Sequence, residues 1–353
     1  MGLAWIEISN IRNLQPVRLN LCSGFNALHG LNGSGKTSFL EALYILGRGT
    51  SFRSKNLDRV IRIGANNFYV SGKLEPNLTP LGFEYQTSGP QIRIAGQPAR
   101  SRMQLAEHMP LLFISPESQS LISEGPQQRR RFLDWGVFHV EPGFLPTYRL
   151  YQRALKQRNK ALGYPGIESA WDSELARAAE QVTQYRSEYV NKLVPYVEQY
   201  IQQLLNIKNV SLHFSPGWRH EISYSEVLRS SLANDREYGF TRHGPHRADI
   251  TLKVENRLVR DTLSRGQQKI MVFALLLAQV ALLNDHTATK PLIMIDELAA
   301  EIDVEHRKRL MSVLAELNAQ IFITLTEKRA LEPYEYPLIN WFHVEQGCIT
   351  KTK

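Results

Sequence analysis

The chain has 353 residues, of which 43% are hydrophobic, and it carries a formal net charge of +8 at pH 7. This length and composition exclude a marginal fold and predict two or three lobes around a large core. The basic balance favours a polyanionic partner such as nucleic acid, although a balance of this size is also common on solvated surfaces.

Residues 1–115 predict one part of an α/β lobe. Alternating or continuous apolar residues predict strands at 5–8, 17–21, 25–29, 68–74, 81–87, 91–95 and 111–114, with a turn at Gly89-Pro90. A helix is predicted over 38–46, directly after the strand at 25–29 and a glycine-rich loop.

That loop reads Gly30-Leu31-Asn32-Gly33-Ser34-Gly35-Lys36-Thr37 and fits the phosphate-binding pattern G-x-x-x-x-G-K-[ST]. The glycines let backbone N–H groups converge on a triphosphate, and the helix that follows, with Ser38 in its first turn, adds the positive end of its dipole. We expect Lys36 to bridge the β- and γ-phosphates and Thr37 to hold Mg²⁺. A glycine-rich turn without a ligand is the alternative, and the strand-loop-helix context disfavours it.

Residues 116–240 predict a mainly helical lobe. Pro126 opens a helix that contains Arg129, Arg130 and Arg131. From about 144 to 208, apolar residues recur at spacings of four and three, and Pro195 is expected to kink or end that helix. This stripe favours packing against a neighbouring helix over a groove for a partner.

Residues 241–353 predict the remaining part of the α/β lobe that contains the phosphate loop. The pattern indicates a hairpin over 249–263, helices over 266–284 and 304–317, and strands at 292–295 and 321–325. The strand at 292–295 ends in Asp296 and Glu297. Because strand alternation aims these carboxylates in different directions, one can orient a magnesium shell while the other polarises the attacking water.

A third motif precedes the helix at 266–284. Ser264 can cap this helix, Gly266 leaves its first N–H groups open to an anion, and Gln267 completes the pattern S-x-G-Q. An ordinary N-cap before a core helix is the alternative. The order of phosphate loop, S-x-G-Q, Asp-Glu strand and acidic residues at 300–303 favours a phosphate-reading role.

With these motifs in this order, the chain resembles ABC-type ATPase heads of the SMC class. Segments 113–117, 125–134 and 244–247 are similar to the RecF family of bacterial recombination mediators, over essentially the whole chain. The resemblance implies an α/β fold: an ABC-type P-loop ATPase head with a mixed sheet sandwich lobe and a helical lobe.

The resemblance also implies a nucleotide site shared by two copies. One copy's phosphate loop and the other's Ser264, Gly266 and Gln267 would bind each ATP, giving an ATP-dependent homodimer. The expected catalytic residues are Lys36, Ser264 and Glu297, with Thr37 and Asp296 holding Mg²⁺ and a weak, DNA-stimulated ATPase acting as a dimerisation switch. Thr326 would stand where many ABC ATPases have a histidine, and segment 244–249, with Ala248 in place of the family's usual acidic residue, has no expected role.

For partners, the resemblance implies sequence-independent binding of double-stranded DNA near gaps, together with RecO and RecR and, indirectly, RecA. Candidate DNA contacts are Arg53, Lys55, Arg129, Arg130 and Arg131, none interleaved with aromatic residues that would suggest single-strand stacking. Arg53 is similar in placement to an arginine of SMC heads that reaches phosphate or DNA, and a surface arginine is the alternative.

Two other ABC-type heads are the alternatives for function. A transporter ATPase subunit would have less chain between residues 37 and 264, and a long-armed SMC-type protein would need hundreds of heptad residues.

The sequence predicts a reduced, cytoplasmic, nucleoid-associated protein. No secretory signal is visible, and only Cys22 and Cys348 could pair. The most apolar stretch, 270–283, is short for a bilayer and contains Gln279, so we expect a buried helix and no membrane anchor. No metal other than Mg²⁺ is expected, because His243 and His246 lack a second ligand pair.

Overall fold

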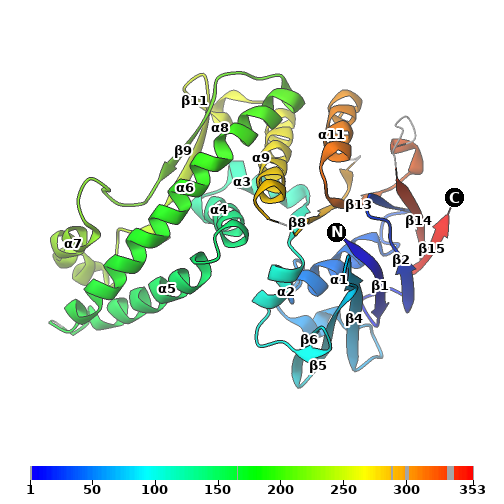
Figure 1. Ribbon diagram of the computed structural model, residues 1–353, viewed down its shortest axis with the longest axis horizontal. Helices are drawn as coiled ribbons and strands as arrows, with labels where there is room; N and C mark the ends of the chain where they lie inside the picture. The colour runs from blue at the N-terminus through cyan, green and yellow to red at the C-terminus, as the bar shows by residue number, and fades with distance from the viewer. Residues whose placement is uncertain (1, 165, 288, 299–301, 332–337, 353) are drawn as a thin grey trace. The chain divides into compact units, whose positions relative to one another are not determined.

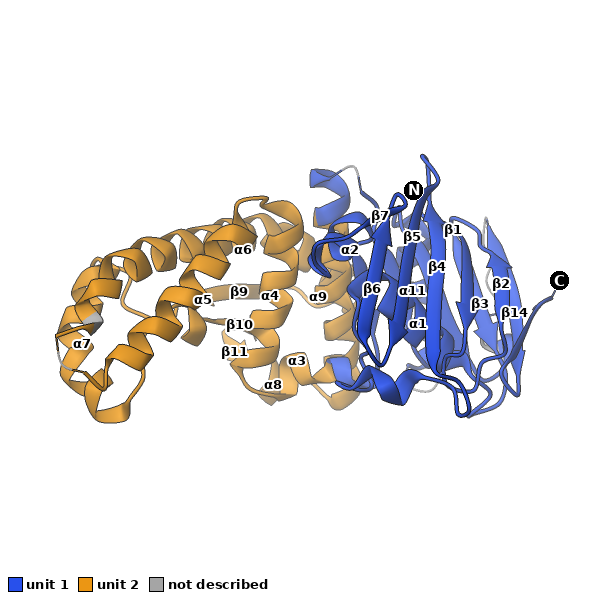
Figure 2. Cartoon of the chain, turned by 90° about the horizontal axis from the view of Figure 1, so that it is seen from below, with its two compact units in different colours: residues 1–118, 283–353 blue, residues 119–282 orange. Residues whose placement is uncertain are grey.

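The computed structural model divides into two compact units, which Figure 2 colours separately. Unit 1 consists of residues 1–118 and 283–353, and unit 2 consists of residues 119–282. The structure describes residues 2–164, 166–287, 289–298, 302–331 and 338–352.

Unit 1 contains an antiparallel sheet with the strand order β2-β1-β4-β5-β6-β7. Its strands are β1 (Leu3–Ser9), β2 (Val17–Asn20), β4 (Asn67–Leu74), β5 (Thr79–Gln86), β6 (Gly89–Ile94) and β7 (Gln97–Pro98). Alternate apolar residues such as Ile6, Ile8, Phe68 and Val70 are buried, so one face of this sheet packs on the core.

The second sheet of unit 1 has the order β15-β14-β3-β13-β12-β8. Its strands are β3 (Phe25–His29), β8 (Leu111–Ile114), β12 (Leu292–Ile295), β13 (Gln320–Leu325), β14 (Ile339–Glu345) and β15 (Cys348–Thr352). All neighbours are parallel except β14 and β15. Every residue of β12 and β13 is buried, as expected for parallel strands covered on both faces. The sheet therefore brings the carboxyl ends of β3, β12 and β13 to one edge, although these strands are far apart in sequence.

Helix α1 (Lys36–Arg48) lies between the two sheets of unit 1 and contacts β4 and β5 of one sheet and β8 and β13 of the other (Figure 1). Phe39, Leu40, Leu43 and Leu46 are fully buried on it, and each such side chain stabilises the fold by about 1.5–3 kcal/mol. The other described helical segments of this unit are η1 (Leu57–Val60), α2 (Met103–His108), η2 (Pro116–Gln119), α11 (Val304–Glu316) and η5 (Lys328–Ala330). Because α1 fills the space between the sheets, its N-terminus is fixed at the edge where the parallel strands end.

Unit 2 combines helices with a small antiparallel sheet of order β11-β10-β9. Its elements are α3 (Ser120–Ser123), α4 (Pro126–Val140), α5 (Phe144–Ala161), η3 (Glu168–Trp171), α6 (Asp172–Leu205), β9 (Val210–Ser215), α7 (Tyr224–Tyr238), η4 (Pro245–Arg247), β10 (Asp249–Val254), β11 (Arg257–Leu258), α8 (Val259–Thr262) and most of α9 (Arg265–His286). The predicted hairpin turns at Glu255 and Asn256, but its second strand is short because the chain enters α8.

The long helix α6 packs against α4, α5, α7 and β9, which confirms intramolecular packing of its apolar stripe. Pro195 lies inside α6, so the expectation that it could end the helix is wrong. Leu193 and Val197, on either side of the proline, are both buried, and this packing offsets the cost of about 3 kcal/mol for a proline inside a helix.

The two units divide the chain differently from the sequence expectation. The motif order in the sequence predicts that residues 241–282, which carry the S-x-G-Q motif, belong to the ATPase lobe, but the structure groups them with the helical unit. The reason is that β10 pairs with β9 along six residues and also packs against α4. The expected boundary followed the motifs, whereas the observed one follows the packing.

Helix α9 is the described helix that is long and apolar enough to cross a membrane by length and composition. Of its most apolar window, 83% is buried within the protein, and a core helix of a soluble protein passes the same test. The helix extends beyond the apolar stretch at 270–283, so its length alone does not exclude a membrane span. Its burial within the protein agrees with the buried helix that the sequence predicts.

Candidate functional site

The phosphate loop joins the end of β3 at His29 to the start of α1 at Lys36. Gly30 has φ +152°, and a Cβ there would lie 2.1 Å from the carbonyl oxygen of Val344. Gly35 has φ +122°, and its Cβ would lie 2.9 Å from Leu14. Both positions therefore require glycine.

Lys36 and Thr37 occupy the first turn of α1. The Lys36 ammonium donates to the carbonyl oxygens of Gly30, at 2.7 Å, and Leu31, at 2.9 Å. Burial lowers the pKa of Lys36, while the carboxylates of Glu297 and Asp296 act in the opposite direction. The ammonium is thus positioned over the loop without a carboxylate bound to it.

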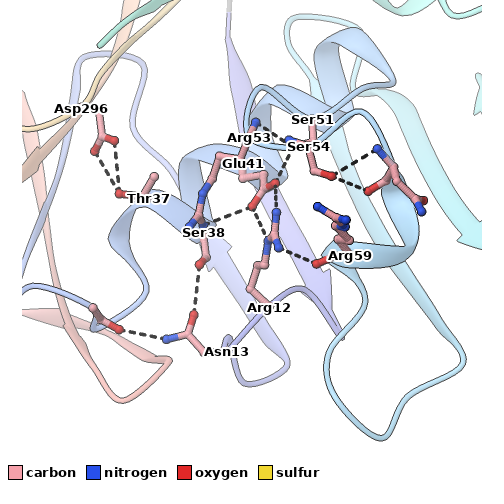
Figure 3. A network of polar contacts seen from close by, with 12 residues as sticks. Arg12, Asn13, Thr37, Ser38, Glu41, Ser51, Arg53, Ser54, Arg59 and Asp296 are labelled. Carbon is pink, nitrogen blue, oxygen red and sulfur yellow. Dashed lines mark hydrogen bonds and ion pairs between the residues drawn. The ribbon is translucent and has the colours of Figure 1, made fainter. Parts of the chain in front are cut away.

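The Thr37 hydroxyl lies 3.2 and 3.3 Å from the two carboxylate oxygens of Asp296, and Figure 3 shows this pair. A hydroxyl and a carboxylate that face each other form an oxygen-only donor set, which Mg²⁺ prefers. The structure therefore brings together the two residues that the sequence predicted for Mg²⁺.

Thr324 of β13 connects the two acidic residues that follow β12, through the carboxylate of Asp296 and the backbone of Glu297. Its hydroxyl donates to Asp296 at 2.6 Å and accepts a hydrogen bond of 2.8 Å from the backbone N–H of Glu297. Glu297 has φ +55°, in the left-handed region, and it lines the cavity that is described below. The Asp296 carboxylate thus contacts Thr37 and Thr324, whereas Glu297 lines the cavity.

A second network supports the other side of α1 (Figure 3). Glu41, which is fully buried, accepts two hydrogen bonds from Arg12 at 2.8 and 2.9 Å and one from Ser51 at 2.5 Å. Arg53 approaches the same carboxylate only to 3.6 Å, and its side chain is 45% exposed. Arg53 is therefore the loosely bound member of this network.

Asn13 connects the loop to the helix. Its amide donates to the carbonyl oxygen of Gly33 at 3.2 Å, and its side-chain oxygen accepts from the Ser38 hydroxyl at 3.0 Å. Ser38, an expected nucleotide contact, is thus 5% exposed and hydrogen-bonded to Asn13.

These groups surround a cavity of about 740 Å³ within unit 1. Its cationic lining residues are Arg12, Lys36, Arg53, Arg59 and Arg62, and its carboxylate is Glu297. Asn32, Gly33, Gly35, Thr37 and Ser38 also line it. A basic cavity at a helix N-terminus, with a hydroxyl-carboxylate pair beside it, fits a nucleoside triphosphate with Mg²⁺.

The S-x-G-Q motif lies in unit 2, at the start of α9. Ser264 caps the helix by accepting from the N–H of Gln267 at 3.3 Å, and the Gln267 side chain accepts from the N–H of Ser264 at 3.0 Å. Ser264, Gly266 and Gln267 are exposed, and a Cβ on Gly266 would meet nothing within 4 Å. The motif therefore presents an accessible helix N-terminus.

The arginines of α4 differ in availability. Arg129 makes a bidentate ion pair with Asp249, at 2.6 and 3.0 Å, and Arg130 donates to the carbonyl oxygen of Ala248 at 2.9 Å. Arg131 is exposed and reaches only Gln128, at 3.3 Å. Lys55 is also exposed.

Segment 244–249 connects three helices of unit 2 through hydrogen bonds and an ion pair, and we call it the strap of unit 2. Its carbonyl oxygen at Pro245 accepts from the buried Arg186 at 2.6 Å, and its His246 ring contacts the Tyr151 hydroxyl at 2.6 Å and the carbonyl oxygen of Thr241 at 2.9 Å. Burial lowers the pKa of His246 to about 4. Together with the Asp249 pair, these bonds tie the segment to α4, α5 and α6.

Sequence reasoning missed the supporting residues Arg12, Asn13, Glu41 and Thr324, which carry no motif. Thr326, expected in the place of the histidine, directly follows β13 and is exposed, whereas Thr324 contacts the Asp296 carboxylate and the backbone N–H of Glu297. Of the acidic segment 300–303, residues 300 and 301 lie outside the described residues.

Comparison with known proteins agrees with this geometry. The profile of the RecF/RecN/SMC N terminal domain matches residues 2–350. The "DNA replication and repair protein RecF" of Pseudomonas fluorescens (strain SBW25) is 42% identical over 363 positions, covering 100% of this chain and 99% of that protein.

Solved structures give the same picture. "Structure of the recombination mediator protein RecF-ATP in RecFOR pathway" has a TM-score of 0.87 and 26% identity, covering 100% of this chain and 98% of that one. An Smc head domain bound to ScpA from Pyrococcus furiosus has a TM-score of 0.63 and 13% identity, covering 99% and 96%, which shows the fold alone. The predicted fold, an ABC-type ATPase head, is confirmed.

Proposed function

Because the chain belongs to the RecF/RecN/SMC N-terminal domain family, we propose that it is an ATP-dependent DNA-binding protein of replication and repair. It closes as a homodimer on double-stranded DNA near gaps, in the cytoplasm and associated with the nucleoid, and its weak, DNA-stimulated ATPase releases it. With RecO and RecR it helps RecA onto single strands. The observation that supports this most is the basic cavity that joins the phosphate loop, the Thr37–Asp296 pair and Glu297.

Within one copy, each residue has a distinct task. Lys36 exchanges its two carbonyl contacts for phosphate oxygens, and the N–H groups of the loop add neutralising dipoles. Thr37 and Asp296 hold Mg²⁺, which when bound supplies positive charge beside the phosphates. Glu297 orients the attacking water and accepts its proton.

The second copy completes the site. Ser264, Gly266 and Gln267 are exposed at the N-terminus of α9, where they can receive the γ-phosphate of a neighbour's nucleotide. In the copy that binds the nucleotide, Arg53 is only weakly paired with Glu41 and lines the cavity. Its side chain can therefore turn toward the phosphates of the bound nucleotide. Closure of two copies therefore depends on the triphosphate.

We expect the exposed cationic side chains that have no strong partner among the described residues to contact duplex DNA. Lys55 and Arg131 are exposed, whereas Arg129 and Arg130 have partners within unit 2. We propose Lys55 of unit 1 and Arg131 of unit 2 as direct contacts, and Arg129 and Arg130 as supports of helix α4, which carries Arg131. Such contacts bind backbone phosphates, so binding should show no sequence preference and should weaken steeply with salt.

A mixing experiment tests the shared site. A Lys36→Ala chain is combined with a Ser264→Arg chain, each alone serving as the inactive control, and ATP hydrolysis is measured with and without duplex DNA. Shared sites predict about a quarter of the wild-type rate, because half of the dimers are mixed and each retains one intact site. No activity in the mixture would refute sharing, and activity that DNA does not stimulate would favour a transporter-type subunit.

A further inference from the structure

Gln268, the residue that follows the S-x-G-Q motif, has a buried side chain to which the proposed function assigns no role. It is 9% exposed, whereas Ser264, Gly266 and Gln267 are exposed. A buried amide costs free energy unless its hydrogens have acceptors, so its partners show what it holds in place.

The side chain of Gln268 reaches back to the chain that precedes the motif. Its Nε2 donates to the carbonyl oxygen of Leu263 at 2.9 Å and to that of Arg260 at 3.1 Å. Helix α8 ends at Thr262, and the last carbonyl groups of a helix have no donor within it. Both hydrogens of the amide group are therefore used, and they satisfy two carbonyl groups at this helix end.

The same residue also closes the turn at the motif. Its backbone N–H donates to the carbonyl oxygen of Ser264 at 2.9 Å. The N–H of Ser264 in turn donates to the Gln267 side chain at 3.0 Å. Hydrogen bonds with the first turn of α9 thus hold Ser264 itself and the residues just before it.

Packing alone holds α8 incompletely. The helix has four residues, and its N-cap makes no side-chain hydrogen bond. Val259 and Arg260 line a cavity of about 250 Å³, together with apolar side chains such as Leu252 and Leu275. One helical turn is unstable by itself, and side chains beside a void lose van der Waals contacts. The two bonds from Gln268 therefore supply much of what fixes the position of α8 relative to α9.

We propose that Gln268 is a positioning residue for ATP hydrolysis. It holds Ser264 and the open N-terminus of α9 in the arrangement that receives the γ-phosphate bound to the other copy. It acts only through Ser264, because its own side chain is buried and bonded to α8. Groups that are already in place need no ordering when the two copies close, so more of the binding energy reaches the transition state. The proposal rests on the shared site proposed above and names what keeps one half of that site in shape.

Removal of the two donors should slow hydrolysis without weakening nucleotide binding. Gln268→Met keeps the volume but has no donor, and kcat should fall about tenfold, as expected for the loss of one to two ordinary hydrogen bonds. Gln268→Glu places a carboxylate against the two carbonyl oxygens, so its kcat should fall further. The Kd of a fluorescent ATP analogue should stay at the wild-type value for both variants, because the described lining of the cavity beside the phosphate loop does not include Gln268.

Thr262→Val is the matched control. The exposed Thr262 hydroxyl donates to the carbonyl oxygen of Leu258 at 2.9 Å, so this variant removes a hydrogen bond of α8 that does not involve Gln268. Its kcat should equal that of the wild type. An equally slow Thr262→Val would show that any disturbance of α8 slows hydrolysis, and the assignment to Gln268 would fall.

Mixed dimers separate a defect of the S-x-G-Q motif from a general loss of structure. Combined with a Lys36→Ala chain, Gln268→Glu should recover about a quarter of the wild-type rate, because half of the dimers are mixed and each retains one intact site. Combined with a Ser264→Arg chain it should recover nothing, because each site of the mixed dimer then has one damaged motif. A chain that is merely misfolded would be rescued by neither partner.

A wild-type kcat in Gln268→Met overturns the proposal, as does rescue by Ser264→Arg in place of Lys36→Ala. The mixture of Lys36→Ala with Ser264→Arg is measured in parallel. If that mixture is active while Gln268→Met is normal, only the role of Gln268 falls; if the mixture is inactive, the shared site is refuted and this proposal with it. Should Gln268→Glu fail to fold, as judged by circular dichroism, Gln268→Met takes its place in both mixtures.

Discussion

Replacement of Thr324 by Val should slow ATP hydrolysis without weakening ATP binding. The Thr324 hydroxyl is buried and connects the Asp296 carboxylate with the backbone of Glu297, donating to Asp296 at 2.6 Å and accepting from the N–H of Glu297 at 2.8 Å. Valine has nearly the same shape, so the change removes these bonds without leaving a cavity. Thr324 does not line the cavity of about 740 Å³, so contacts with the nucleotide should persist.

The magnitude follows from the two bonds. A hydrogen bond to a charged group contributes about 1.5–3 kcal/mol, and its loss also leaves the N–H of Glu297 without its acceptor. Glu297 has φ +55°, a conformation that costs a non-glycine residue about 1–2 kcal/mol and that this N–H bond helps to maintain. If misplacement of Glu297 raises the activation free energy of hydrolysis by about 2 kcal/mol, kcat should fall about 30-fold.

The assay compares kcat with the Kd of a fluorescent ATP analogue. Thr324→Ser retains the hydroxyl and should recover most of the rate. Thr326→Val, two residues further along and exposed, is the matched control and should have the wild-type rate. A Thr324→Val variant that hydrolyses ATP at the wild-type rate would refute the role assigned to this hydroxyl.

Two further predictions concern the phosphate loop and the strap of unit 2. Gly30→Ala should abolish binding of the ATP analogue, because its Cβ would lie 2.1 Å from a backbone oxygen of the neighbouring strand. Gly33→Ala, with φ +79° but nothing within 4 Å of the new Cβ, should lose only about 1–2 kcal/mol of the binding free energy of the analogue. Equal losses of binding free energy for the two variants would contradict the steric argument. For His246, whose pKa burial lowers to about 4, the unfolded chain binds the extra proton first, so stability should fall by up to about 3 kcal/mol as pH drops from 6.5 to 4. In urea unfolding, the stability of His246→Gln should lack this part of the pH dependence. If the free energies of unfolding of variant and wild type changed in parallel between pH 6.5 and 4, titration of His246 would not be the cause.

Local signals predicted much of the fold and of the site. The phosphate loop, the apolar strand before Asp296 and the cap at Ser264 are each contiguous, and each depends on backbone preferences or hydrophobic periodicity within a few residues. The strands β3, β12 and β13 and the helix α1 lie where these patterns placed them, within a few residues. The proximity of Thr37 and Asp296 followed from the order of the motifs.

Other features depended on which segments become neighbours. Arg129 and Arg130 looked like free cations in sequence, but β10 and the residue before it supply their partners. No local pattern encodes such pairings.

The sequence by itself determined that this protein has a phosphate-binding ATPase head, because glycine geometry and strand and helix periodicity are properties of short stretches of chain. Only the tertiary structure decided that Thr324 links the Asp296 carboxylate to the backbone N–H of Glu297, that Glu41 is the buried partner of Arg12, and that residues 241–282 pack with the helical unit. Those outcomes depend on strand register and burial between residues far apart in the chain, where the free energy belongs to the pair and not to either residue.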